Sequence, residues 1–518
     1  MHVCVEIRKG SYYDSVTLML ISKEIKKLDG IKEALVGMGT DLNKELAQNL
    51  GLADEKILGL NPNDFFITVL TEEPKVMKNV VDKVDKLLNE KKESSTGEYN
   101  PPTFDSAVKY EPDSNLVLIS IPGKYAFNEV KKALERDMHV MLFSDNVSIE
   151  EERQLKELAK EKGLLMMGPD CGTAIINHIP LAFANVVSRG PIGIIGASGT
   201  GTQEVSVLID KLGSGVSQVI GTGGRDLKNE IGGIMMIEGI KALTQDDETK
   251  VIVLISKPPA PEIAEKVLQE VKKSGKPFVV NFIGGDTDKI CEYGGVPGYT
   301  LEDTAYKAAT LAADGQPQEM LGYSLPEDDV QQLIEGAVNI LSKEQKYLRG
   351  LYTGGTLCDE AMKMLSKTVG DIYSNIPLKP EYALVNVHQS KEHTCVDLGD
   401  DVFTVNRPHP MIDPSYRQER LLKEAEDEEI AVVLMDFVIG YGAHPDPVGE
   451  MVDSIKKFSI IRDKMGKPVL FIASVCGTTG DPQNLTKQEE KLREAGVLVM
   501  PSNAQAVRLA SDILKRLA

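Results

Sequence analysis

Residues 191–204 read Pro-Ile-Gly-Ile-Ile-Gly-Ala-Ser-Gly-Thr-Gly-Thr-Gln-Glu, which predicts a short apolar strand, a turn, and a helix that begins near Thr202. Because the turn carries little side chain, backbone N–H groups can approach a ligand there, and the positive end of the helix favours negative charge. We therefore predict that Ser198, Gly199 and Thr200 bind a phosphate-like anion. The alternative is a tight connection within a parallel sheet, without any ligand.

The same pattern of an apolar strand followed by a glycine-rich turn recurs along the chain, and this recurrence favours the binding interpretation. Strands that alternate with helices predict an α/β protein with several Rossmann- or flavodoxin-like parallel sheets. Polar stretches without periodicity, at 91–104 and 313–328, are expected to be linkers. The expected domains are a small α+β unit over residues 1–95 and α/β domains over 105–188, 189–315 and 340–518.

Composition narrows the classes of partner. The 518 residues carry a formal net charge of −20, which argues against DNA, RNA or an anionic membrane as the main partner. The sequence shows no signal peptide and no run of about 18 apolar residues, so we expect a cytoplasmic protein. The six cysteines lie far apart and form no Cys-x-x-Cys pair, so we expect free thiols and no metal site.

Two motifs carry a resemblance to a known family. Gly168-Pro-Asp-Cys-Gly matches the Gly-Pro-Asn-Cys-Pro-Gly turn of the succinyl-CoA synthetase α subunit, and Gly196-Ala-Ser-Gly-Thr matches its Ser-Gly-Thr helix start. Residues 105–310 resemble that subunit. Residues 350–518 resemble the carboxy-terminal domain of the β subunit, whereas the nucleotide-binding ATP-grasp domain is absent.

The fused order resembles the FdrA family, usually labelled acyl-CoA synthetase, and Arg407-Pro-His-Pro-Met-Ile-Asp-Pro supports this. The resemblance implies a CoA-binding-like Rossmann domain at 105–188, a CoA-ligase-like flavodoxin-type domain at 189–315, and a β-subunit carboxy-terminal-like domain at 340–518. It also implies partner subunits, an oligomer, and exchange of a carbamoyl group between oxalurate or oxamate and carbamoyl phosphate in allantoin breakdown.

Three departures from succinyl-CoA synthetase bear on the chemistry. Residues 283–304 lack the histidine that is phosphorylated in the synthetases, and Lys257 follows Ser256 where a glutamate is expected. A fixed cation suits a diffusible acyl phosphate, such as carbamoyl phosphate, although Lys257 is equally well explained as a solvated surface lysine. Residues 7–15 contain one glycine where the synthetases bind the CoA phosphates, which argues against CoA as a cofactor.

Acyl transfer to phosphate needs an anion cradle, cations and proton donors. Arg225 and Arg407 can pair bidentately with a carboxylate or phosphate, and His409 and His444 are candidate proton donors. Cys171 has no visible basic partner, so packing explains it better than nucleophilic catalysis. The predicted catalytic residues are His409, His444, Arg407 and Lys257; the predicted phosphate or substrate ligands are Ser198, Gly199, Thr200, Gly223, Gly224, Arg225, Gly354, Gly355, Thr356, Tyr441 and Gly442; the CoA-like cleft comprises Gly168, Pro169, Asp170 and Cys171.

Three functions remain open from the sequence. The first is a carbamoyl or acyl transferase subunit without a phosphohistidine, acting on small anionic substrates. The second is a component of an NDP-forming acyl-CoA ligase, which requires a separate ATP-grasp chain. The third is a non-catalytic subunit that senses CoA or a metabolite. Turnover with partner chains separates the third from the others, and CoA dependence separates the first two.

Overall fold

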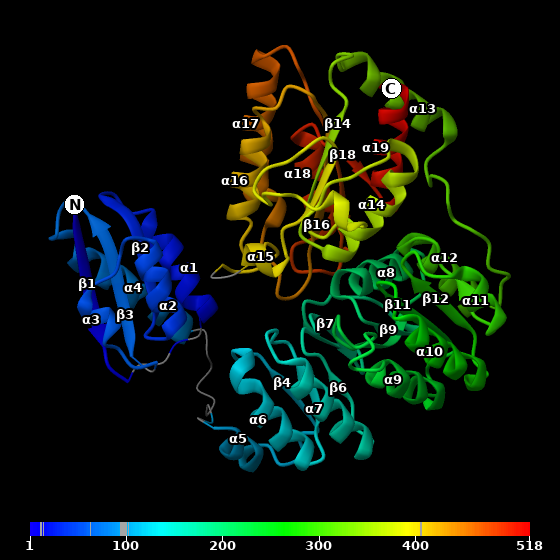
Figure 1. Ribbon diagram of the computed structural model, residues 1–518, viewed down its shortest axis with the longest axis horizontal. Coiled ribbons are helices and arrows are strands. Elements are labelled where there is room, and N and C mark those ends of the chain that lie inside the picture. Colours follow the sequence, from blue (N-terminus) through cyan, green and yellow to red (C-terminus); the bar gives the residue numbers. More distant parts are fainter. Residues whose placement is uncertain are drawn as a thin grey trace. The chain divides into compact units, whose positions relative to one another are not determined.

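The computed structural model describes residues 1–517 except 11, 12, 14, 63, 94–100, 102, 405 and 406. The chain forms two compact units, Met1–Tyr110 with Asp401–Pro408, and Glu111–Asp400 with His409–Ala518 (Figure 1). Among the helices of this described part, none is long and apolar enough to cross a membrane.

The smaller unit is built on an antiparallel sheet with strand order β1-β3-β2. Alternating side chains of its central strand serve two cores, because Phe65 and Ile67 pack on one face with Leu18, while Phe66 packs on the other with Leu52. Its elements are β1 (His2–Arg8), α1 (Ser15–Lys26), β2 (Ile31–Met38), α2 (Asp41–Asn49), α3 (Glu55–Leu58), β3 (Phe65–Thr71), α4 (Val76–Glu93), α5 (Phe104–Tyr110) and α15 (Asp401–Thr404).

The larger unit begins with a three-stranded parallel sheet of order β4-β5-β6. A hairpin of β7 and β8 follows and joins the next sheet, where β7 pairs with β10. The sequence-based boundary at residue 188 had grouped this hairpin with the preceding domain. The elements are β4 (Leu116–Ile119), α6 (Gly123–Glu135), β5 (His139–Leu142), α7 (Ile149–Glu161), β6 (Met166–Met167), β7 (Thr173–Ile176) and β8 (Ile179–Ala182).

The second sheet of this unit has the order β13-β12-β11-β9-β10-β7-β8, and its strands from β9 to β13 run parallel. The chain leaves β9 towards β10 and leaves β11 towards β12, so the order reverses between β9 and β11. Ligands of open α/β sheets bind at such a point. The elements are β9 (Arg189–Gly196), α8 (Gly199–Lys211), β10 (Val216–Gly221), α9 (Ile234–Gln245), β11 (Val251–Ser256), α10 (Pro261–Ser274), β12 (Phe278–Phe282), α11 (Thr287–Glu292), β13 (Val296–Pro297) and α12 (Leu301–Ala312).

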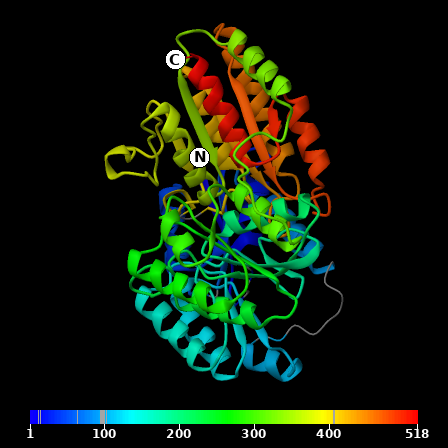
Figure 2. The same cartoon turned by 90° about the vertical axis from the view of Figure 1, so that its right-hand side faces the viewer.

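The last sheet is parallel throughout, with the order β15-β14-β16-β17-β18, and it reverses between β14 and β16. Helices α16 and α17 lie on one side of it and α14 and α19 on the other (Figures 1 and 2). The elements are α13 (Glu327–Ile340), β14 (Tyr347–Tyr352), α14 (Gly355–Val369), η1 (Pro380–Tyr382), β15 (Thr394–Asp397), α16 (Ser415–Glu424), β16 (Ile430–Val438), α17 (Pro447–Lys464), β17 (Leu470–Cys476), α18 (Leu485–Glu494), β18 (Leu498–Met500) and α19 (Asn503–Leu517).

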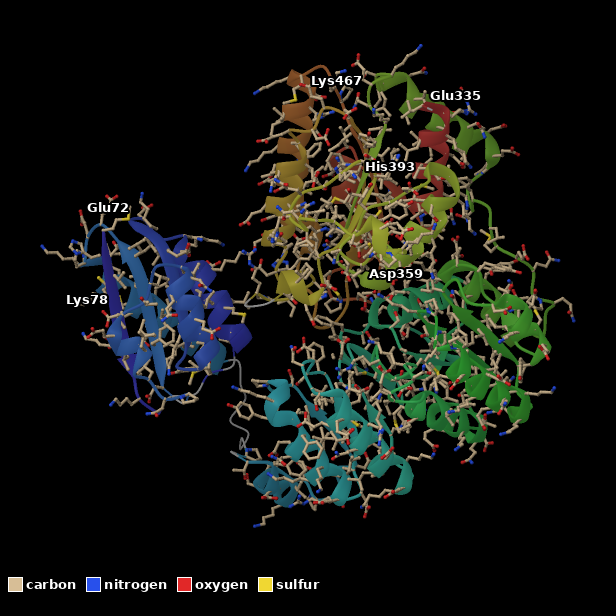
Figure 3. The ribbon with its side chains drawn as sticks, viewed as in Figure 1. Glu72, Lys78, Glu335, Asp359, His393 and Lys467 are labelled. Atoms are coloured by element: carbon tan, nitrogen blue, oxygen red, sulfur yellow. The ribbon has the colours of Figure 1, made fainter. Side chains whose placement is uncertain are left out.

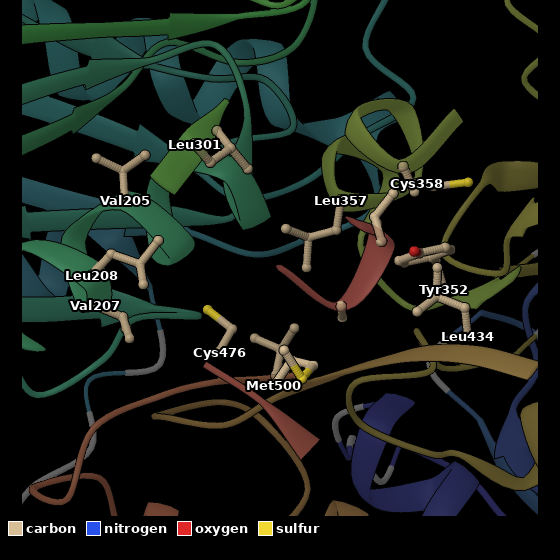
Figure 4. Close-up of a cluster of buried hydrophobic side chains, with 14 of the residues drawn as sticks. Val205, Val207, Leu208, Leu301, Tyr352, Leu357, Cys358, Leu434, Cys476 and Met500 are labelled. Carbon is tan, nitrogen blue, oxygen red and sulfur yellow. The ribbon is translucent and has the colours of Figure 1, made fainter. Parts of the chain in front are cut away.

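One hydrophobic core serves both of these larger sheets. Val205 and Leu208 of α8 belong to the same buried cluster as Leu357 of α14, Leu434 of β16 and Met500 of β18 (Figure 4). Helix α8 also packs against α14, and α12 packs against α19. Parallel sheets covered on both faces confirm the predicted α/β fold class. The shared core holds the two sheets, and therefore their strand-end turns, in a fixed relation.

Candidate functional site

The amino-terminal ends of α8 and α14 meet. Ser198 caps α8, its Oγ accepts the N–H of Gly201 at 3.1 Å, and the same Oγ lies 2.5 Å from Oγ1 of Thr356 in the first turn of α14. A Cβ added to Gly354 would lie 2.8 Å from Thr200 Oγ1, so the two turns touch. Because Ser198 provides the cap, α8 begins at Gly199 and not near Thr202 as the sequence had suggested.

These two helix ends form a cradle of free donors. Helix geometry leaves the N–H groups of Gly199, Thr200, Gly355 and Thr356 without an intrahelical acceptor. Within the part of the chain that the structure describes, no other acceptor engages them. Two positive helix ends with unpaired N–H groups and two hydroxyls suit an anion. The structure thus brings together six of the predicted ligands: Ser198, Gly199, Thr200, Gly354, Gly355 and Thr356.

Sheet topology explains why these turns converge. The turn before α8 follows β9, and the turn before α14 follows β14, the strands beside which each sheet reverses its order. Each turn therefore lies at the carboxyl edge of its own sheet, in the crevice that the reversal opens. The common hydrophobic core holds these two sheet edges next to each other.

A buried aspartate holds the second turn. Asp436 on β16 is fully buried and accepts hydrogen bonds from the N–H of Thr353 at 2.8 Å, the hydroxyl of Thr353 at 2.9 Å and the N–H of Gly354 at 2.9 Å. Arg417 pairs with the same carboxylate at 3.0 Å and also donates to the carbonyl of Leu351. Asp436 was absent from the predicted ligands, yet it determines where α14 begins.

Lys257 reaches this region from the end of β11. Its Nζ lies 2.8 Å from Oδ2 of Asp359, which lies in the amino-terminal half of α14 (Figure 3). Burial lowers the pKa of Lys257, but the neighbouring acidic groups, Asp359 first and Asp397 after it, together outweigh that effect and the pKa is raised. Half of the Lys257 side chain stays exposed, so the ammonium is both anchored by a carboxylate and accessible.

Asp397 lies next to the cradle and was not identified from the sequence. It ends β15, is 8% exposed, and its Oδ1 accepts the N–H of Gly399 at 2.9 Å. Its Oδ2 lies against Gly355, because a Cβ added to that glycine would be 2.4 Å away. Burial prevails over the Gly399 N–H and over Lys257, and it raises the pKa of the Asp397 carboxyl to about 7.

His409 and His444 are both hydrogen-bonded to the backbone of Met411. His409 Nδ1 accepts the N–H of Met411 at 3.2 Å, and the N–H of His444 donates to the carbonyl of Met411 at 2.7 Å. Burial lowers the pKa of His409 to about 4, so its ring is neutral at pH 7. A Cβ added to Gly399 would lie 2.4 Å from His409 Nε2, which places this ring beside the loop that follows Asp397.

Three further predicted regions have surroundings of their own. Arg407 is exposed and belongs to the smaller compact unit. Tyr441 has an exposed side chain, and its N–H donates to the carbonyl of Ala184 at 2.8 Å, which ties the turn of Tyr441 and Gly442 to the segment after β8. In the smaller unit, Arg8 pairs with Asp85, and Ser11, Tyr12 and Asp14 of the amino-terminal turn lie outside the described residues.

The turn at Gly223 interlocks with the predicted CoA-like turn. A Cβ on Gly223 would lie 2.2 Å from the carbonyl oxygen of Pro169, and one on Gly224 would lie 3.6 Å from Asp170. The Arg225 guanidinium donates to the Val147 carbonyl at 2.8 Å and lies 2.8 Å from the buried carboxylate of Glu152. Arg225 is therefore engaged by the protein's own groups.

Cys171 lies within this packed region. The side chain is 1% exposed, and burial raises the pKa of its thiol to about 12. A thiol of that pKa is almost entirely protonated at pH 7, so it is a poor nucleophile. We expect a maleimide or iodoacetamide probe to modify the exposed Cys291 in the folded protein and to leave Cys171 unmodified until denaturant is added. Peptide mapping checks this, and early labelling of Cys171 would restore it as a candidate nucleophile.

Three protein families match successive parts of the sequence. Residues 1–102 match a family described as AllF, heavy metal-associated domain, residues 187–284 match the CoA binding domain, and residues 351–513 match the CoA-ligase family. Among the described residues, no group of three or more His, Cys, Asp or Glu side chains is placed to hold a metal ion.

Several known proteins are similar to this chain over different shares of its length. The chain is 45% identical to the protein YahF from Escherichia coli (strain K12) over 514 residues, which cover 99% of each chain. It is 29% identical to subunit alpha 2 of the ADP-forming succinate–CoA ligase from Archaeoglobus fulgidus, over 36% of this chain and 65% of that subunit. The solved ATP citrate lyase from Methanothrix soehngenii aligns with 80% of this chain and 83% of its own at 12% identity, with a TM-score of 0.35.

Proposed function

The chain belongs to the FdrA-like family of acyl-CoA synthetase-type proteins with a succinyl-CoA synthetase-like fold, and from this premise we propose that it is a subunit that transfers a carbamoyl or another acyl group to or from phosphate. The observation that carries the proposal is the pair of facing helix ends, with the unpaired N–H groups of Gly199, Thr200, Gly355 and Thr356. Such a cradle stabilises the phosphoryl oxygens of an acyl phosphate and the charge that develops on the leaving phosphate.

The chain's own residues divide this work. The N–H groups of the two helix ends and the hydroxyls of Ser198 and Thr356 bind and orient the phosphoryl oxygens. Lys257, held at 2.8 Å from Asp359, contributes positive charge from the neighbouring sheet. Since residues 283–304 contain no histidine, the acyl group passes directly between the acyl phosphate and its acceptor, without a phosphoenzyme relay. In this proposal, partner subunits complete the substrate site. Allantoin breakdown is a pathway in which such a reaction would take place.

The second candidate is a component of an acyl-CoA synthetase, and the matches to the CoA binding domain and to CoA-ligase favour it. The resemblance to succinyl-CoA synthetase implies a CoA-like cleft at the turn after β6, whereas the matched CoA binding domain covers residues 187–284 and so includes the α8 end of the cradle. The turn after β6 offers few donors. The N–H of Asp170 donates to the Ser144 carbonyl at 3.0 Å, and the N–H of Cys171 donates to the Leu142 carbonyl at 3.2 Å. Asp170 and Cys171 therefore offer no free N–H group to a CoA phosphate, and we derive no step through CoA at this turn.

Replacing Ser198 with alanine tests the cradle. The variant loses one hydroxyl next to the bound anion and the cap of α8, so we expect carbamoyl phosphate and inorganic phosphate to bind about 10-fold or more weakly, as for a lost hydrogen bond to a charged group. Ser148→Ala is the matched control, because Ser148 caps α7 in the same way and lies outside the cradle. Calorimetric titration measures both variants; equal losses in the two would show that the weaker binding reflects general destabilisation and not a contact in the cradle.

A ligand panel on the whole protein distinguishes the two candidate functions. Stabilisation by carbamoyl phosphate and by oxamate, with no response to CoA, supports transfer through an acyl phosphate. Saturating ligand at about 100 times its Kd raises the free energy of unfolding by about 2.7 kcal/mol, which a thermal shift detects. Stabilisation by CoA alone would instead support the acyl-CoA synthetase component or a sensing subunit.

A further inference from the structure

A carboxyl group without a cation partner lies beside the proposed anion cradle. Asp397 is more than nine-tenths buried at the end of β15, where it pairs across the sheet with Tyr352, the last residue of β14. Its Oδ1 accepts the N–H of Gly399 at 2.9 Å, and among the described residues no donor is hydrogen-bonded to Oδ2. Oδ2 lies against Gly355, whose own N–H is one of the cradle donors.

The charged groups around Asp397 do not neutralise it. Lys257 reaches in from the end of β11, but its ammonium is already paired with Asp359 of α14 at 2.8 Å. Asp400, in the loop after β15, adds further negative charge. His409 faces the same loop through Gly399 and is neutral at pH 7, because burial lowers its pKa. Cys358 of α14 is buried, and burial also raises the pKa of its thiol, so it is neutral too.

An ionised Asp397 would repel the anion that the two helix ends attract, because two negative charges within a few ångströms of each other in a buried site interact strongly. A protonated carboxyl has the opposite effect, since its O–H donates a hydrogen bond to an anionic oxygen. We propose that Asp397 binds the phosphoryl group as the neutral acid, so that each anion that enters the cradle is accompanied by one proton on Asp397 Oδ2.

The proton comes from solvent, remains on Oδ2 and is shared with the nearest anion oxygen, so no other group changes its protonation state. Burial already holds the pKa of this carboxyl near 7 in the unliganded protein, which keeps the neutral form available at small cost. In the transfer reaction the same O–H meets the charge that develops on the leaving phosphate. This inference rests on the proposed anion cradle and adds the protonation state in which the cradle works.

Inorganic sulfate is the suitable probe, because its charge stays constant between pH 6 and pH 9 while phosphate itself titrates. Sulfate should bind the full-length protein with similar affinity below pH 6.5 and about 10-fold more weakly for each pH unit above the pKa of Asp397. Titration calorimetry at pH 8 in two buffers of different ionisation enthalpy should show the uptake of nearly one proton per sulfate bound. That measurement needs no variant.

The variant Asp397→Asn should remove both effects. Its side chain is neutral at every pH, so sulfate affinity should become independent of pH and exceed that of the unmodified protein at pH 8.5. Asp400→Asn is the matched control, because it removes a neighbouring negative charge and should retain the pH dependence and the proton uptake.

The outcomes separate this inference from the proposed function. If the unmodified protein binds sulfate without proton uptake, or if Asp397→Asn keeps the original pH profile, the protonation proposal is wrong while the cradle stands. If neither sulfate nor phosphate binds at any pH, the anion cradle itself is wrong, and the proposed function fails with it.

Discussion

Replacing Asp436 with alanine should lower the free energy of unfolding of the larger unit by about 3–5 kcal/mol and abolish detectable anion binding. The variant leaves the guanidinium of Arg417 buried without its carboxylate partner, and Arg417 is 2% exposed. It also removes the acceptor for the N–H groups of Thr353 and Gly354, which fix the turn before α14. Urea denaturation measures the first effect, and sulfate titration measures the second.

A double variant separates the charge from the turn. Asp436→Leu combined with Arg417→Met removes both charges, so much of the lost stability should return, as it does when a buried ion pair becomes apolar. The N–H groups of Thr353 and Gly354 remain without their acceptor, so anion binding should stay lost. A double variant that regains anion binding would show that Asp436 does not position the turn.

A structural feature could be predicted from the sequence when its signal lies within one short stretch of residues. The turn at Ser198 was predictable because a glycine-rich stretch directly follows an apolar run, and residues 191–204 contain the whole pattern. The β7 and β8 hairpin was missed because Asn177 and His178 form its turn, both with positive φ, at 49° and 66°. Asn-Gly is the usual signature of such a turn, and histidine in the second place concealed it.

The residues that tune the site depend on long-range pairing. Asp397 on β15 and Asp436 on β16 reach the turn after β14 only because β14 lies between these two strands. Tyr352 pairs with Asp397, and Leu351 pairs with Met435. No local pattern encodes that order. Burial is equally invisible in the sequence, and it is burial that makes His409 neutral at pH 7 and Cys171 unreactive. The predicted roles of Arg407 and His444 remain predictions.

Leu357→Ala should destabilise both large sheets together, by about 2–5 kcal/mol, because the leucine side chain is fully buried in the core that α8 and α14 share (Figure 4). A cavity at this place loosens contacts of β9 to β12 and of β14 to β17 alike. Hydrogen exchange followed by mass spectrometry should therefore show faster exchange in residues 189–282 as well as in 347–476.

Leu18→Ala provides the matched control for this experiment. Leu18 is equally buried, but it lies in α1 of the smaller unit, so its loss should increase exchange in residues 2–93 and leave both large sheets unchanged. If Leu357→Ala accelerates exchange in only one of the two sheets, they fold independently. The facing ends of α8 and α14 would then be set by a contact between separate domains, and the geometry of the anion cradle would not be fixed by a common core.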